Sequence, residues 1–123
     1  MKKGDYFHDR LKRLITEYIL LGYKVSKVFP SDERFGLTSQ CRRALLSVMF
    51  NYVEGYARSR PKQLLNFYET SYGSLQESIT AFYFATQFKY ISKENYIKLY
   101  DYKEEIAKML WKTIEGLRKD IKE

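Results

Sequence analysis

The sequence of 123 residues has one cysteine, one histidine and two prolines, and these scarcities exclude several classes of protein. A single cysteine, Cys41, cannot form an intramolecular disulfide and is too little to build a zinc site. No run of about 18 apolar residues occurs, which excludes a membrane-spanning helix. The N-terminus lacks the apolar stretch of a secretion signal, so we expect a reduced, cytoplasmic setting.

Catalytic motifs are also missing from the sequence. His8, the only histidine, lies far in sequence from Ser47 and Glu54, and we expect it to be a solvated residue without a catalytic role. The Glu-x-x-His pair of di-metal bundles and the glycine-rich phosphate loops do not occur. We therefore expect no enzyme activity, no metal and no cofactor.

The charge of the chain is unevenly distributed. The net charge of +7 lies in residues 1–63, which hold 13 Lys and Arg against 6 Asp and Glu, whereas residues 64–123 hold 9 of each. A solvated basic surface explains this excess, and so does a face that meets phosphate or an acidic protein. Composition does not separate these two interpretations.

Apolar residues recur at helical spacing in four segments, and we expect helices over residues 5–28, 38–57, 61–87 and 93–120. The seam of the first segment runs from Phe7 to Val28. Proline at positions 30 and 61 and polar residues before position 93 mark the breaks. Short connections favour antiparallel neighbours. The sequence therefore predicts one all-α domain, an antiparallel up-down-up-down four-helix bundle.

The 38–57 segment carries a polar stripe, which we expect to join polar residues of the 61–87 segment in a structural network. Arg43 is expected to pair with Glu77 or Glu54, and Asn51 to bond across to Ser74. Such groups need partners, because an unpaired buried one costs about 1–3 kcal/mol. The expected network comprises Gln40, Arg43, Ser47, Asn51, Glu54, Ser74 and Glu77.

Two apolar stripes lie beside the polar one on the same segment, although a surface helix needs only one. The first comprises Cys41, Leu45, Val48 and Tyr52. The second comprises Leu46, Met49, Phe50 and Val53. Either the other helices bury this segment deeply, or the second stripe contacts a neighbouring subunit. We favour the subunit interface, because a small bundle has little surface with which to cover a second stripe.

Three motifs give the chain a resemblance to a known family. Residues 29–44 resemble the pattern F-P-x-x-E-x-F-G-L-x-x-Q-x-R-R-A, and residues 47–58 resemble S-x-x-x-N-x-x-E-G-x-x-R. Residues 73–77 match G-S-x-x-E. These motifs resemble the bacterial four-helix bundle family encoded in intervening sequences of 23S rRNA genes, often labelled a ribosomal protein. The chain departs from the pattern in the bulk of Met49, Phe50 and Val53.

This resemblance implies a ring-like homo-oligomer, a pentamer, without assigned catalytic residues. It also implies relatives that act as accessory factors of retroelements and present a basic surface to nucleic acid and a reverse transcriptase. We accordingly expect binding of RNA or DNA. The candidate contacts are Arg34, Arg42, Arg58, Arg60, Lys62, Lys12, Arg13, Lys24 and Lys27. Two alternatives stay open: a scaffold for an acidic protein partner without a nucleic-acid role, and a cargo of an rRNA insertion with little cellular role.

Overall fold

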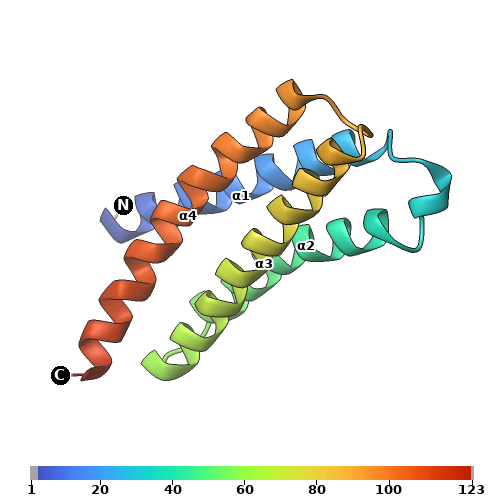
Figure 1. Cartoon of the computed structure of the whole chain (residues 1–123). Coiled ribbons are helices and arrows are strands. Elements are labelled where there is room, and N and C mark those ends of the chain that lie inside the picture. The colour runs from blue at the N-terminus through green and yellow to red at the C-terminus, as the bar shows by residue number, and fades with distance from the viewer. Residues whose placement is uncertain (1–2, 123) are drawn as a thin grey trace.

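The computed structural model describes residues 3–122, which form an all-α four-helix bundle (Figure 1). The helices are α1 (Lys3–Ser26), α2 (Leu37–Tyr56), α3 (Pro61–Gln87) and α4 (Lys93–Lys122), with a short 3₁₀ helix η1 (Ser31–Glu33) between α1 and α2. Within this described range there is no strand. None of these helices combines the length and apolarity needed to cross a membrane.

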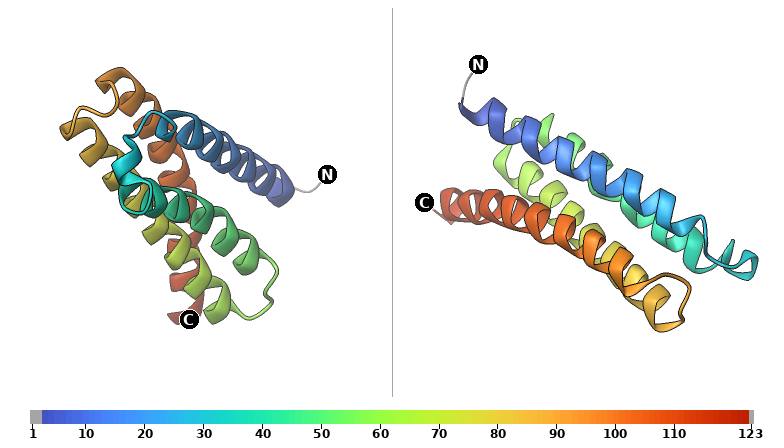
Figure 2. Two further views of the ribbon diagram at one scale, coloured as in Figure 1. Left: turned by 90° about the vertical axis from the view of Figure 1, so that its right-hand side faces the viewer. Right: turned by 90° about the horizontal axis from the view of Figure 1, so that it is seen from above.

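The chain direction reverses at each of the three connections between long helices (Figures 1 and 2). Each long helix contacts its neighbours in sequence, and α1 also contacts α4, which closes the bundle. The contact between α2 and α3 is the most extensive. The start of α1, the α2–α3 connection and the end of α4 lie at one end, and η1 and the α3–α4 connection lie at the other (Figure 1).

The first connection is organised by the Glu33 carboxylate. Its Oε1 accepts a hydrogen bond from the backbone N–H of Leu37 at 3.1 Å, which caps the start of α2. Its Oε2 accepts a hydrogen bond of 2.8 Å from the hydroxyl of Tyr90, in the α3–α4 connection. One side chain therefore links two connections at the same end of the bundle.

The other helix ends follow local rules. Pro61 begins α3, where its missing N–H is not needed, and the preceding Arg60 is extended (φ −86°, ψ 123°). The Ser92 hydroxyl accepts the N–H of Asn95 at 3.1 Å and caps α4. The first helix ends at Ser26, two residues before the predicted end. From residue 27 to residue 29 each backbone N–H bonds to the carbonyl three residues earlier, and not four as in an α-helix, and Pro30 follows.

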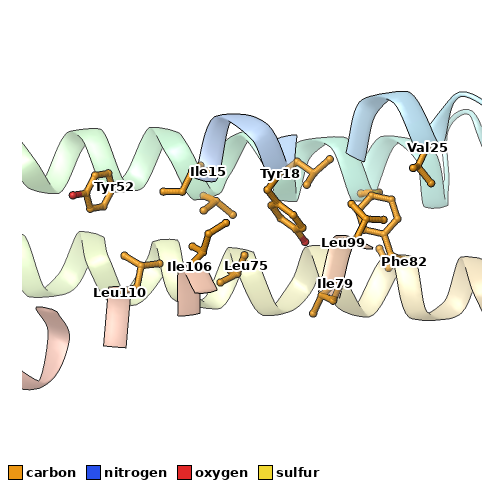
Figure 3. Packing of buried hydrophobic residues seen from close by; sticks show 14 of the residues in the cluster. Ile15, Tyr18, Val25, Tyr52, Leu75, Ile79, Phe82, Leu99, Ile106 and Leu110 are labelled. Atoms are coloured by element: carbon orange, nitrogen blue, oxygen red, sulfur yellow. The ribbon is translucent and has the colours of Figure 1, made fainter. Parts of the chain in front are cut away.

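The core lies between all four helices and is formed mainly by aliphatic side chains, several of which Figure 3 shows together with the rings of Tyr18 and Phe82. Along α1 the fully buried stripe is Leu11, Ile15 and Tyr18, continued by Val25. Val28, which the predicted seam includes, is exposed instead. The seam stops early because α1 has already ended.

Gly22 lies in the middle of α1, where glycine costs about 1 kcal/mol against alanine. A Cβ at this position would lie 2.6 Å from Leu45 Cδ1 and 3.2 Å from Phe82 Cζ. The missing side chain thus lets α1 approach the side chains of α2 and α3 closely, which compensates for the weak helix propensity.

Candidate functional site

The polar stripe of α2 faces α3 and joins it through Ser47. The hydroxyl oxygens of Ser47 and Ser74 are 2.7 Å apart, and Asn51 Nδ2 donates to both the Ser47 hydroxyl and the Ser47 carbonyl at 2.9 Å. Asn51 therefore reaches Ser74 through Ser47, and not directly as expected from the sequence. We call Ser47, Asn51 and Ser74 the polar bridge.

Two surface pairs flank the polar bridge. Gln40 Nε2 donates to Glu77 Oε2 at 3.3 Å, and Arg58 lies 2.6 Å from Glu54 one turn away on α2. The expected pairing of Arg43 with Glu77 or Glu54 is wrong. Both carboxylates are held by other residues of the stripe, and Arg43 is exposed without a hydrogen-bond or ion-pair partner in the described part of the chain.

Small residues on α3 allow this close contact with α2. The Ser71 hydroxyl donates to the Val48 carbonyl at 2.7 Å across the interface, and its side chain is completely buried. The sequence-based interpretation missed this residue, although the signal was present as small residues at helical spacing. The buried small residues of α3 are Ser71, Ser74, Ser78, Ala81 and Ala85.

The outer face of α2, formed by Leu46, Met49, Phe50 and Val53, is only partly covered by the residues that the structure describes. Phe50 is 62% exposed and Val53 is 44% exposed, whereas Leu46 and Met49 are half-buried at its edges. The first apolar stripe is buried in the core, with Cys41, Leu45 and Val48 fully enclosed. The other helices therefore do not bury the second stripe deeply, because Phe50 and Val53 remain exposed.

Arg42 does not belong to the free basic surface. Its Nε donates to the Ser26 hydroxyl at 2.9 Å, its Nη2 lies 3.4 Å from the Tyr23 carbonyl, and its guanidinium lies 4.8 Å from the Tyr23 ring centroid. A cation at the C-terminal end of α1 also interacts favourably with the helix dipole. Arg42 thus fastens α2 to α1, and its guanidinium is already engaged by these groups of α1.

The remaining basic candidates are exposed but do not form one patch. Arg58, Arg60 and Lys62 lie at the α2–α3 connection, and we call these three residues the basic connection. The 20 residues of α2 rise about 30 Å, so this end is far from the basic residues at the other end of the bundle. Lys24, Lys27 and Arg34 lie at that other end, and Lys12 and Arg13 lie along α1.

The basic connection borders a shallow hollow. Arg60 and Lys62 line it together with Ile121 from the last turn of α4. Both cations are exposed, and neither has an ion-pair partner among residues 3–122. The last turn of α4 adds Lys119 and Lys122. Arg58 differs, because Glu54 already neutralises part of its charge.

His8 is more enclosed than the sequence suggests. Its ring stacks on Tyr56 with centroids 3.5 Å apart, and its Nδ1 lies 2.9 Å from the Tyr52 hydroxyl. Burial raises the pKa of Tyr52 well above its usual range. The histidine is therefore part of an aromatic contact between α1 and α2, and not a solvated residue.

Other reactive groups are also held in structural roles. Burial raises the pKa of the Cys41 thiol to about 12, so it is protonated at neutral pH. Between residues 3 and 122, no group of three or more His, Cys, Asp or Glu is placed to hold a metal ion.

The family comparison agrees with the motifs. The model of the family described as 23S rRNA-intervening sequence protein matches residues 14–112, which include α2, α3 and most of α1 and α4. No curated protein matches the chain.

Proposed function

Since the chain belongs to the 23S rRNA-intervening sequence protein family, we propose that it is a non-enzymatic, homo-oligomeric protein that binds RNA or DNA through a basic surface. We place it in the cytoplasm, where the lone thiol of Cys41 would stay reduced. The family resemblance leaves two forms of this function open: a factor of the rRNA-intervening-sequence type, and an accessory factor of a retroelement with a reverse transcriptase as partner.

The observation that carries the proposal is the pair Arg60 and Lys62 in the basic connection. Both are exposed and unneutralised in the described chain, and they stand at the start of α3, where the helix dipole is positive. Lys119 and Lys122 at the end of α4 extend the positive charge of this end. Phosphate groups are the ligands that such a cluster attracts, and the guanidinium can donate two parallel hydrogen bonds to one phosphate.

Self-association is supported by the outer face of α2. Phe50 and Val53 form an apolar surface that solvent would otherwise contact, and such surfaces commonly mark protein interfaces. A second copy of the chain is the occupant we propose, and a pentamer is the number that the family resemblance favours.

The absence of catalysis is part of the proposal. Ser47 is held by Ser74 and Asn51 and has no general base among its hydrogen-bond partners. His8 is engaged with tyrosines on α2, and the protonated thiol of Cys41 is a weak nucleophile.

A salt-dependent binding titration tests the nucleic-acid proposal. Labelled RNA and DNA are titrated with the protein at several salt concentrations, and the affinity should fall steeply as salt rises. The double charge reversal Arg60→Glu and Lys62→Glu should weaken binding. It should also reduce the slope of log affinity against log salt by about two, since each lost phosphate contact removes about one.

The matched control reverses Lys98 and Lys108, two exposed residues of α4, which changes the net charge equally. Binding that falls equally in both double variants would mean that overall charge, and not the basic connection, is responsible. If the unaltered protein binds neither RNA nor DNA at low salt, the proposal is wrong and the basic surface is better assigned to an acidic protein partner.

A further inference from the structure

A continuous series of aromatic rings runs along the surface where α3 ends and α4 begins. Neighbouring ring centroids along the series are 5.3–6.3 Å apart. Its inner end meets the core, because the Tyr90 ring also contacts Phe29 at 6.0 Å. The members, which we call the ring series, are Tyr100, Tyr96, Tyr83, Phe84, Phe88 and Tyr90.

The core does not account for the outer rings. Phe84 is 47% exposed and Phe88 is 54% exposed, while the core contacts of this part of α3 are made by Phe82 and Ala85, which are completely buried. Tyr83 is 45% exposed beside them. Contiguous exposed apolar surface of this kind commonly marks a binding site.

The ring series is flanked by cations. Lys89 and Lys93 are exposed, and neither forms an ion pair within the part of the chain that the structure describes. Arg34 is also near, because the hydrogen bond from Tyr90 to Glu33 holds the end of η1 against the α3–α4 connection. Positive charge beside exposed rings complements an anionic partner that also presents flat apolar faces.

Lys89 occupies a costly backbone conformation. Its φ of 65° lies in the left-handed region, and the N–H of Tyr90 closes the helix end on the Ala85 carbonyl at 2.8 Å. Glycine is the residue that usually takes this position, and another residue costs roughly 1–2 kcal/mol there. Lys89 thus places a positive charge at a position of the connection where glycine would make the protein more stable.

We propose that this end of the bundle binds single-stranded nucleic acid, with unpaired bases stacking on Tyr83, Phe84 and Phe88 and with Lys89 and Lys93 contacting the phosphates. The inference rests on the proposed nucleic-acid function and adds a second contact site, at the end of the bundle opposite the basic connection (Figure 1). Only unpaired bases offer free faces to aromatic side chains, because the bases of a duplex stack on one another. Lys89 and Lys93 have no ion-pair partner among residues 3–122, so the charge of this surface favours a polyanion as the partner.

The test compares three probes of about 12 nucleotides, a length within the range that single-strand binding sites cover. These are a labelled single strand, the same strand with abasic sites in place of its bases, and the matching duplex. The unaltered protein should bind the single strand at least about tenfold more tightly than the abasic strand, because one stacked base alone contributes about that factor. It should also prefer the single strand over the duplex.

The variant Phe84→Ala/Phe88→Ala should lose most of the preference for the single strand over the abasic strand, because only the Tyr83 ring remains for stacking. The control Tyr6→Ala removes a ring that is 67% exposed near the start of α1, far from the ring series. This variant should keep the preference for bases. Light scattering and thermal unfolding of each variant check that assembly and fold are retained, which is expected because the substituted rings lie outside the core.

The outcomes separate this inference from the proposed function. Binding of all three probes with equal affinity would overturn the stacking site and leave the basic surface in place. An alanine variant that changes the assembly size but keeps the base preference would reassign the ring series to a contact between copies. Failure of the unaltered protein to bind any probe would overturn both proposals.

Discussion

The hydroxyl of Tyr18 on α1 lies 2.6 Å from the hydroxyl oxygen of Ser78 on α3, across the centre of the bundle. Ser78 in turn donates its hydrogen to the Leu75 carbonyl at 2.8 Å, so Tyr18 is the donor and Ser78 the acceptor. Both side chains are completely buried. This bond links two diagonal helices through the centre of the core.

The two partners should therefore differ in their tolerance to substitution. Ser78→Ala leaves the buried Tyr18 hydroxyl without an acceptor and should lower the free energy of unfolding by about 1–3 kcal/mol. Tyr18→Phe leaves Ser78 bonded to Leu75 and should cost only about 0.5–1.5 kcal/mol. Urea unfolding of both variants and of the double variant, at one protein concentration, measures the difference. A larger loss for Tyr18→Phe than for Ser78→Ala would contradict the assigned donor.

Two mid-helix glycines should respond to alanine with opposite signs. Gly22→Ala brings a methyl group into contact with Leu45 and Phe82 and should destabilise the protein by about 1–3 kcal/mol. A Cβ at Gly73 would meet no atom of another described element within 4 Å, so Gly73→Ala should stabilise the protein by about 0.5–1 kcal/mol through helix propensity. Thermal unfolding of each variant checks both signs, and a shift in the same direction would refute the close approach at Gly22.

Charge on the outer face of α2 should disrupt self-association. Phe50→Glu/Val53→Glu places two carboxylates on the proposed subunit contact, where burial of unpaired charge is unfavourable. Light scattering should then give the mass of a single chain. Ile97→Glu, at a position of α4 that is 52% exposed, is the control and should leave the mass unchanged. If the control also reduces the mass, the contact lies elsewhere or is diffuse.

Alkaline pH should destabilise the fold, and Cys41 should contribute to this effect. Its pKa rises from 9.0 to about 12 because the thiol is buried, so above pH 9 the unfolded chain loses a proton that the folded chain keeps. This contribution to stability is complete below pH 9 and is lost between pH 9 and pH 12. The free energy of unfolding of Cys41→Ala should fall less steeply over this range.

A decline with pH should remain in that variant, since burial also raises the pKa of Tyr68 to about 12. Thiol labelling provides a second measurement, because the buried protonated thiol should react only as fast as the chain opens. Rapid labelling of the native protein at pH 8 would disagree with the burial of Cys41.

The fold class was predictable because periodicity alone places residues on faces. The all-α four-helix bundle is confirmed, and so is the family, whose motifs lie along residues 29–77. Val28 was assigned to the seam wrongly, since periodicity does not register that a following proline ends the helix early. The division of α2 into a core stripe and an exposed stripe follows from the same spacing rule.

The partners of polar residues were less predictable than their faces. Arg43 and Arg42 are adjacent in sequence, yet the first is exposed and the second fastens α2 to Tyr23 and Ser26. Helical spacing shows which face of the helix a residue lies on, but not which neighbouring side chain becomes its hydrogen-bond partner. The buried hydroxyls of Ser71 and Ser78 were missed for a related reason, because serine is also common on solvated surfaces.

The Glu33 carboxylate couples the start of α2 to the α3–α4 connection, because it binds a group in each. The same side chain caps α2 at Leu37 and holds Tyr90, the innermost member of the ring series. A strand bound on the ring series would stabilise this arrangement, and opening of the α3–α4 connection would release the cap. Hydrogen exchange at the Leu37 amide, on a different helix, should therefore slow when the ring series is occupied.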